Sequence, residues 1–212
     1  GACLIETKIA VGDTEAQNFA NWFMYYRRRH QAMRASVPYA FDGMSNLNVK
    51  AFSIQNRSTD LTMLDFGTQS NTFYNDIYNL YPKSADGLGT PNRQAVFYAG
   101  EQFQRTNAGA PVTAECQKNF TLLFTDGHSA ADTSSGVGNV DTGRAAPFGD
   151  TYSNTMAEIA AYFYDGDGTP LVPNATLTSG KVPVHNSCNA DDDPLWIDCQ
   201  ENLHVNLYAV LL

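Results

Sequence analysis

The segment Asn119–Thr125 (NFTLLFT) constrains the fold more than any other part of the sequence. It is short, apolar on both faces, and followed by Asp126-Gly127, a pair typical of a turn. A strand without polar alternation is expected to be covered on both sides, as in the parallel sheets of α/β proteins. We therefore predict a buried parallel strand here, with a loop directly after it.

Helical segments alternate with predicted strands along the rest of the chain. Apolar residues recur at helical spacing over residues 14–36, 71–80, 91–105 and 152–164. Further strands are predicted at residues 49–54 and 62–66, and a buried final strand at 204–212. This alternation predicts an α/β fold with a mainly parallel sheet. The length of 212 residues is that of a single domain, which we expect to cover residues 1–212.

The acidic balance of the chain excludes one class of partner. The formal net charge is -9, and such a chain repels phosphate backbones, so we expect no nucleic-acid binding. No apolar run approaches the roughly 20 residues that a membrane helix needs, so we expect no membrane insertion. Cations are the more natural partners of this charge.

The chain has four cysteines, Cys3, Cys116, Cys188 and Cys199, and none of them forms a CxxC pair. An even number of separated cysteines is typical of disulfides formed in an oxidising compartment. Cys188 and Cys199 bracket one polar loop and are predicted to pair. Cys3 and Cys116 would then pair by elimination. Four buried free thiols are the alternative.

Thr90 and Asp126 are the first candidate site residues. Thr90 precedes Pro91, a combination suited to begin a helix, and Asp126 follows the predicted buried strand. Ligands bind at the carboxyl ends of strands in open α/β sheets, where a hydroxyl and a carboxylate suit Mg²⁺ or Ca²⁺. The alternative is that Thr90 is only a helix cap and Asp126 only a turn residue.

An enzymatic interpretation rests on Ser129. Residues 127–131 (GHSAA) follow a strand and resemble the G-x-S-x-G elbow of serine hydrolases, with Ala in the last position. His185 or His204 could act as the base. An elbow needs a helix directly after the serine, however, and the residues that follow are poor helix formers. We therefore expect no enzymatic activity and keep a secreted serine hydrolase as the alternative.

Several segments resemble, in order, those of the PilY-type proteins of type IV pili. The matching segments are residues 17–27 (QNFANWFMYYR), 89–95 (GTPNRQA), 116–127 (CQKNFTLLFTDG), 152–160 (YSNTMAEIA), 193–196 (DPLW) and 204–210 (HVNLYAV). The order of aromatic residues in the first of them is unusual, which makes that match specific. Together the matches span nearly the whole chain.

The resemblance implies a von Willebrand factor A-like domain, which is a Rossmann-type three-layer sandwich with helices on both faces of a mainly parallel central sheet. It also implies a metal-ion-dependent adhesion site, in which Thr90 and Asp126 match two of the ligands. The D-x-S-x-S element that supplies the others is absent, together with the first strand that precedes it. We therefore expect these parts upstream of Gly1, in a chain truncated at both ends, with long loops as a further departure from compact domains of this type.

For function, the resemblance implies an adhesin or tip module of a type IV pilus. Such a module would act in pilus assembly, surface adhesion and twitching motility, and would bind a divalent cation, Mg²⁺ or Ca²⁺. The implied partners are the minor pilins and the pilus tip complex, a host or abiotic surface receptor, and the C-terminal β-propeller of the same full-length protein. The implied location is extracellular, at the pilus tip on the bacterial cell surface, after export through the periplasm.

Overall fold

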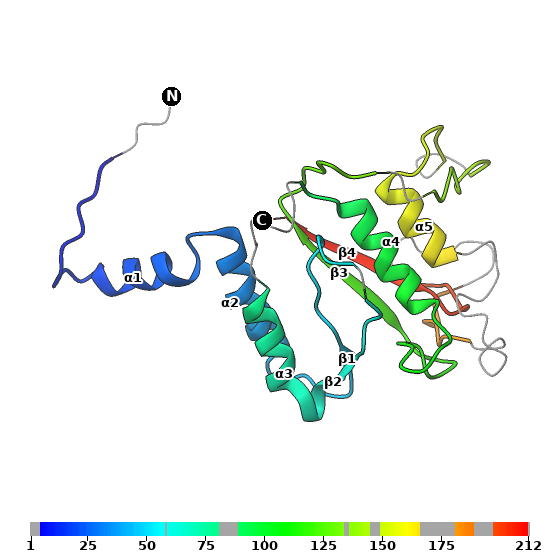
Figure 1. Ribbon diagram of the computed structural model, residues 1–212, viewed down its shortest axis with the longest axis horizontal. Coiled ribbons are helices and arrows are strands. Elements are labelled where there is room, and N and C mark those ends of the chain that lie inside the picture. The colour runs from blue at the N-terminus through cyan, green and yellow to red at the C-terminus, as the bar shows by residue number, and fades with distance from the viewer. Residues whose placement is uncertain are drawn as a thin grey trace. The chain divides into compact units, whose positions relative to one another are not determined.

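The computed structural model describes residues 5–57, 59–80, 89–133, 136–144, 149–165, 181–188 and 197–211. Its elements in chain order are α1 (Ala16–Tyr25), α2 (Arg29–Phe41), β1 (Asn48–Val49), β2 (Leu64–Asp65), α3 (Phe66–Asn79), α4 (Asn92–Phe103), β3 (Asn119–Thr125), α5 (Met156–Asp165) and β4 (Val205–Leu211) (Figure 1). This mixture of helices with a small parallel sheet is compatible with the α/β class. None of the described helices has the length and apolarity that a membrane crossing requires.

The chain divides into two compact units, a smaller one of residues 1–47 and 65–81 and a larger one of residues 48–64 and 82–212. The smaller unit contains α1, α2 and α3, and aromatic packing joins α2 to α3. The ring of Phe41 in α2 lies 5.7 Å from that of Phe66 and 5.3 Å from that of Phe73, both in α3. Such ring pairs stabilise the contact beyond the area that they bury.

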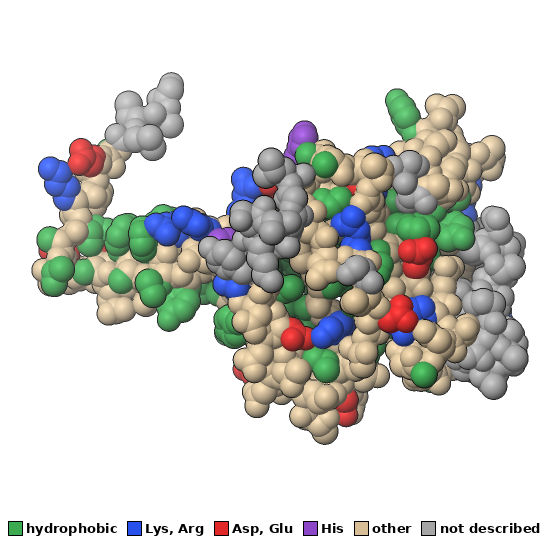
Figure 2. Space-filling view, viewed as in Figure 1, with side chains coloured by type: hydrophobic (Ala, Val, Ile, Leu, Met, Phe, Trp, Pro, Cys, Tyr) green, Lys and Arg blue, Asp and Glu red, His purple; other side chains and the backbone are tan. Residues whose placement is uncertain are grey.

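Residues 14–36 were predicted to form one helix, and this prediction is wrong. Helix α1 ends at Tyr25 and α2 begins at Arg29. The side chain of Gln31 accepts a hydrogen bond from the backbone N–H of Arg28 (3.2 Å), a group that a helix start leaves without an intrahelical partner. This bond favours a new helix at that point. No residue of α1 is buried, and Figure 2 shows hydrophobic side chains along this helix.

In the larger unit, β3 and β4 pair in parallel, with Asn119 opposite Val205 and Thr125 opposite Leu211. The side-chain amide of Asn119 donates a hydrogen bond to the carbonyl of His204 (3.1 Å), which fixes the first rung of the pair. The apolar strand predicted at residues 119–125 is therefore present, and it lies in a parallel sheet. Its predicted burial on both faces is wrong, because Phe120 is 54% and Leu122 46% exposed.

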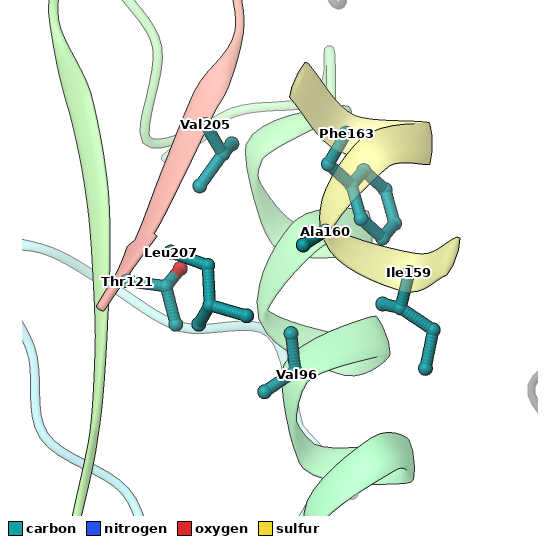
Figure 3. A pocket seen from close by; sticks show the side chains of 8 residues that line it. Val96, Thr121, Ile159, Ala160, Phe163, Val205 and Leu207 are labelled. Atoms are coloured by element: carbon teal, nitrogen blue, oxygen red, sulfur yellow. The ribbon is translucent and has the colours of Figure 1, made fainter. Parts of the chain in front are cut away.

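Helices α4 and α5 cover one face of the β3–β4 pair (Figure 1). In Figure 3, the helix side chains Val96, Ile159, Ala160 and Phe163 face Thr121, Val205 and Leu207 of the strands around a small apolar cavity. The close approach of the two helices depends on Gly100. A Cβ atom at this position would lie 2.2 Å from the ring of Phe163, so a larger residue would force the helices apart.

The opposite face of the β3–β4 pair is exposed within this unit. Phe120 and Tyr208 are each 54% exposed, and β4 is buried only at Val205. The prediction of a buried final strand is therefore wrong, because the helices of this unit that contact the pair both pack on its other face. In place of one central sheet, the described strands form two sheets of two strands, β1–β2 and β3–β4.

The strand predicted at residues 49–54 is reduced to the two residues of β1. The segment after β1 packs against α4 through its side chains and backbone. The ring of Phe52 lies 5.2 Å from that of Tyr98, and the backbone N–H of Leu61 donates to the Gln102 side chain (2.8 Å). These contacts hold the segment in an irregular path beside the helix.

Replacing Ile159 by Ala tests the core beneath α5. Ile159 is 0% exposed, and its truncation leaves a cavity, so we expect the free energy of unfolding to fall by about 2–5 kcal/mol in urea denaturation. The control is Tyr162→Ala in the same helix, where the side chain is 39% exposed. Equal losses in the two variants would show that Ile159 is not at the centre of this core.

Candidate functional site at the end of strand β3

A chain of hydrogen bonds joins the carboxyl end of β3 to the start of α4. The hydroxyl of Thr125 donates to the side-chain carbonyl of Asn92 (3.0 Å), and the Asn92 amide donates to Ser129 Oγ (3.4 Å). Thr125 Oγ1 also accepts from the backbone N–H of Gly127 (3.2 Å). Because Asn92 is buried and is the first residue of α4, these bonds fix the loop after β3 against the helix start.

An antiparallel bridge ties the same loop to Thr90. The backbone N–H of Thr90 donates to the carbonyl of Ala130 (2.7 Å), and that of Ala130 donates to the carbonyl of Thr90 (3.3 Å). Gly89 has a φ of +134°, and a Cβ atom there would lie 2.6 Å from the Ala130 carbonyl oxygen. Glycine is required for this approach because any side chain would clash. The bridge brings together the loops that contain Thr90 and Asp126.

Asp132, for which no local sequence pattern indicates a role, caps α4. Its side chain is 2% exposed and accepts hydrogen bonds from the backbone N–H groups of Arg93 (2.8 Å) and Gln94 (3.2 Å). The guanidinium Nε of Arg93 lies 3.3 Å from the same carboxylate. A negative charge here satisfies helix donors that have no partner within the helix and interacts favourably with the helix dipole.

Thr90 was expected to cap this helix, and that prediction is wrong. Helix α4 begins at Asn92, and the residue at the cap position is Pro91. Both backbone hydrogen-bonding groups of Thr90 are used in the bridge to Ala130, and the helix donors are satisfied by Asp132. The absence of this cap does not test the predicted role of Thr90 and Asp126 as cation ligands, which stays a prediction. Asp126 itself is exposed at the start of the loop.

A second group of oxygen ligands lies in the larger unit. Within the described part of the chain, the carboxylates of Asp141, Asp150 and Glu158 have oxygen atoms within 4.8 Å of one another. Glu158, which is buried, accepts from the backbone N–H of Val140, and Asp150 accepts from that of Tyr152 (2.7 Å). Such a set could hold Ca²⁺, and its bonds also attach a loop to α5. No motif in the sequence indicates this cluster, because the fold brings the three carboxylates together.

The surroundings of Ser129 differ from those of a hydrolase nucleophile. Its hydroxyl accepts a hydrogen bond from Asn92. Nδ1 of His185 accepts from the backbone of Ser187 (3.1 Å), and the ring nitrogens of His204 face a backbone carbonyl and the carboxylate of Asp198. The described residues that follow, 130–133 and 136–144, contain no helix. The structure therefore gives no support to a nucleophile elbow.

A disulfide joins Cys188 and Cys199, the pair predicted from the short polar loop between them. Cys116 is exposed and has no disulfide partner among the described residues. Cys3, the partner predicted for it, lies outside the described residues, so that pairing stays a prediction.

Beside this disulfide, Asp198 accepts hydrogen bonds from two elements. Tyr164 of α5 donates its hydroxyl proton (3.1 Å), and Asn206 of β4 donates from its amide (2.9 Å). Partial burial acts to raise the pKa of Asp198, but hydrogen bonds from Asn206 and His204 together outweigh it, so the pKa lies below its ordinary value. Burial, followed by the nearby Asp198 charge, raises the pKa of Tyr164 to about 12.

Curated proteins similar to this chain are type IV pilus biogenesis factors named PilY1. The chain is 29% identical over 202 residues to PilY1 of Pseudomonas aeruginosa strain PAK, which covers 80% of the chain and 17% of that protein. It is 28% identical over 196 residues to PilY1 of strain PAO1, covering 77% of the chain and 17% of that protein. The resemblance to PilY-type proteins is confirmed.

The chain thus spans less than a fifth of the length of the PilY1 proteins that it matches. No family model matches it, and no solved structure matches it, so the von Willebrand A fold stays a prediction. The PilY-like segments occupy central parts of the site. Residues 89–95 contain Gly89 and Thr90 of the bridge, and residues 116–127 include β3 and end just beyond Asp126.

Replacing Asp132 by Ala tests the cap of α4. The change leaves helix N–H groups and the Arg93 guanidinium without their acceptor, so we expect the free energy of unfolding to fall by about 2 kcal/mol in urea denaturation. The matched control is His128→Ala in the same loop, where an exposed side chain is removed and a change within about 0.5 kcal/mol is expected. A loss in the control as large as that in Asp132→Ala would contradict the assignment.

Proposed function

We propose that this chain is a module of a PilY-type protein that acts in type IV pilus biogenesis. The observation that supports the proposal is the similarity to PilY1 over 80% of the chain. The PilY-like segments at residues 89–95 and 116–127 include β3 and Thr90 of the bridge at its end. Because the chain covers only 17% of PilY1, the proposal concerns one module and not the activities of a whole protein.

The proposed module acts by binding and catalyses nothing. Its loops at the end of β3 are held by the bridge at Thr90 and by the buried carboxylate of Asp132, and the hydroxyl of Ser129 is engaged by Asn92. Loops fixed on a scaffold at the carboxyl end of a strand are well suited to present a binding surface. This arrangement supports recognition of a partner more readily than bond cleavage.

The proposed partners are minor pilins within the tip complex, a host or abiotic surface receptor, and a β-propeller of the same full-length protein. Binding to them would serve pilus assembly, adhesion and twitching motility. The proposed location is the pilus tip at the bacterial cell surface, reached through the periplasm. The disulfide between Cys188 and Cys199 supports this location, because such bonds persist in oxidising compartments.

An exchange of segments in P. aeruginosa tests the proposed function. A PilY1 whose matching segment is replaced by this chain should restore surface pili and twitching, compared with a PilY1 that lacks the segment. Pili are counted by electron microscopy and the hybrid protein is quantified by immunoblot. A hybrid that is present at normal levels but performs no better than the deletion would contradict the proposal. The same hybrid with Ser129→Ala should work equally well, whereas its failure would favour the hydrolase.

We further propose that a divalent cation, Mg²⁺ or Ca²⁺, binds at the loops of Thr90 and Asp126. Calorimetric titration of the hybrid PilY1, which supplies the residues before this segment, should show binding of each ion that Asp126→Ala weakens at least tenfold, roughly the effect of losing one charged ligand. The control is Asp150→Asn, which changes the exposed member of the acidic cluster and should leave binding intact. If Asp150→Asn weakened binding and Asp126→Ala did not, the ion would be assigned to the acidic cluster. The absence of binding heat would contradict the proposal that a cation binds.

A further inference from the structure

His204 is almost completely buried, at 2% exposure, and both of its ring nitrogens face hydrogen-bond acceptors. Nδ1 lies 2.6 Å from the carbonyl oxygen of Asn202, and Nε2 lies 2.9 Å from Oδ2 of Asp198. A carbonyl oxygen and an ionised carboxylate can only accept, whereas a neutral imidazole has a single N–H group. Both bonds therefore form together only when the ring carries two protons.

The carboxylate of Asp198 is in the ionised form that this arrangement needs. Besides His204, it faces three donors: the hydroxyl of Tyr164, the amide of Asn206 and the backbone N–H of Gln200 (3.3 Å). These hydrogen bonds favour the charged form and offset the cost of partial burial. With two protons on the ring, Asp198 and His204 would form an ion pair with direct hydrogen bonding between the charged groups.

We propose that Asp198 and His204 form a pH-sensitive latch, which holds the segment next to the disulfide against α5 and β4 while the imidazole carries two protons and loosens when one is lost. The segment in question contains Asp198 and Cys199, and it joins α5 through Tyr164 and β4 through Asn206. The latch is a property of the fold itself and does not depend on the proposed pilus function.

A second arrangement of the same side chains is available after the proton leaves. The amide nitrogen of Asn206 lies 3.1 Å from His204 Nε2. Two N–H donors cannot bond to each other, but a deprotonated Nε2 can accept from Asn206. The lone pair of Nε2 would then face Oδ2 of Asp198. Because both atoms are acceptors, their separation of 2.9 Å becomes unfavourable. Asp198 is expected to withdraw, and its bond to Tyr164 weakens with it.

Among the described residues, the other titratable groups of this region are Asp198, Tyr164, Lys181 and Glu201. Tyr164, with its pKa at about 12, stays neutral, and Lys181 and Glu201 lie 3.6 Å from each other at a neighbouring bridge. Because the pKa of Asp198 is lowered in the folded chain, this carboxylate stabilises the fold at pH values above its unfolded-state pKa. That stabilisation is lost as pH falls through its folded-state pKa. The ion pair between Asp198 and His204 exists only while the imidazole carries its second proton. Histidine is the side chain that ordinarily changes charge between pH 5 and 8.

Nitrogen-15 NMR of the histidine rings in the intact, oxidised chain tests the proton state directly. At pH 5.5, His204 should show protons on both ring nitrogens, and at pH 8 on Nδ1 alone. Amide hydrogen exchange at Gln200 and Asn202, corrected for the intrinsic rate, should become about tenfold faster at pH 8. A ring with one bare nitrogen in the folded protein at pH 5.5, or exchange that does not change with pH, would overturn the latch.

Melting temperatures of His204→Gln and His185→Gln separate the latch from general histidine titration. The Tm of each protein is compared at pH 5.5 and pH 8. On this change, the Tm of the unmodified chain and of His185→Gln should fall about 4 °C further than that of His204→Gln, because the glutamine amide does not titrate. The contribution of His30, whose pKa is lowered first by burial and then by Arg34 and Arg28, is common to all three and cancels. The same dependence of Tm on pH in all three proteins would overturn the proposal. Should His204→Gln fail to fold, Tyr164→Phe, which removes one bond of the latch, should raise the exchange at Gln200.

Discussion

The packing of α4 and α5 onto one face of β3 and β4 is the constraint on which the rest of the larger unit depends. Two parallel strands alone bury too little apolar surface to be stable, and a covering helical layer supplies the missing burial. Ile159 and Phe163 provide much of that contact, and Gly100 allows it to be close. Once α4 is seated, its first turn lies at the carboxyl end of β3, where the loops of the candidate site meet.

The sequence predicts the elements of this packing because their signals are local. The apolar run at residues 119–125 and the helical spacing around Ile159 each indicate an element whose existence does not depend on distant residues. Other predictions failed where a tertiary contact decided the outcome. The segment after β1 has the composition of a strand, yet its packing on α4 at Tyr98 leaves it irregular, and a single hydrogen bond to Gln31 accompanies the division of the first helix.

The candidate site was predictable only in part for the same reason. A strand that ends in Asp126 and a helix that begins near Thr90 can be read from neighbouring residues, and both loops do meet. The cap from Asp132 joins residues 39 positions apart, and the acidic cluster at Glu158 combines a loop with a helix. The proton arrangement at His204 depends on which atoms the fold places at each ring nitrogen. Neither spacing nor composition carries that information.

The pairing of β3 with β4 also has a consequence for how the chain folds. The hydrogen bond that opens the pair joins residues 85 positions apart, so the strands meet only after a long stretch of chain has been arranged between them. Contacts of such long range form slowly, because the entropy of closing the loop is lost before any burial is gained. Val205 and Leu203 belong to the core, so the helices lack part of their apolar partner until β4 arrives. The core of the larger unit would therefore stay incomplete, and its chain accessible to proteases and chaperones, until β4 pairs at a late step of folding.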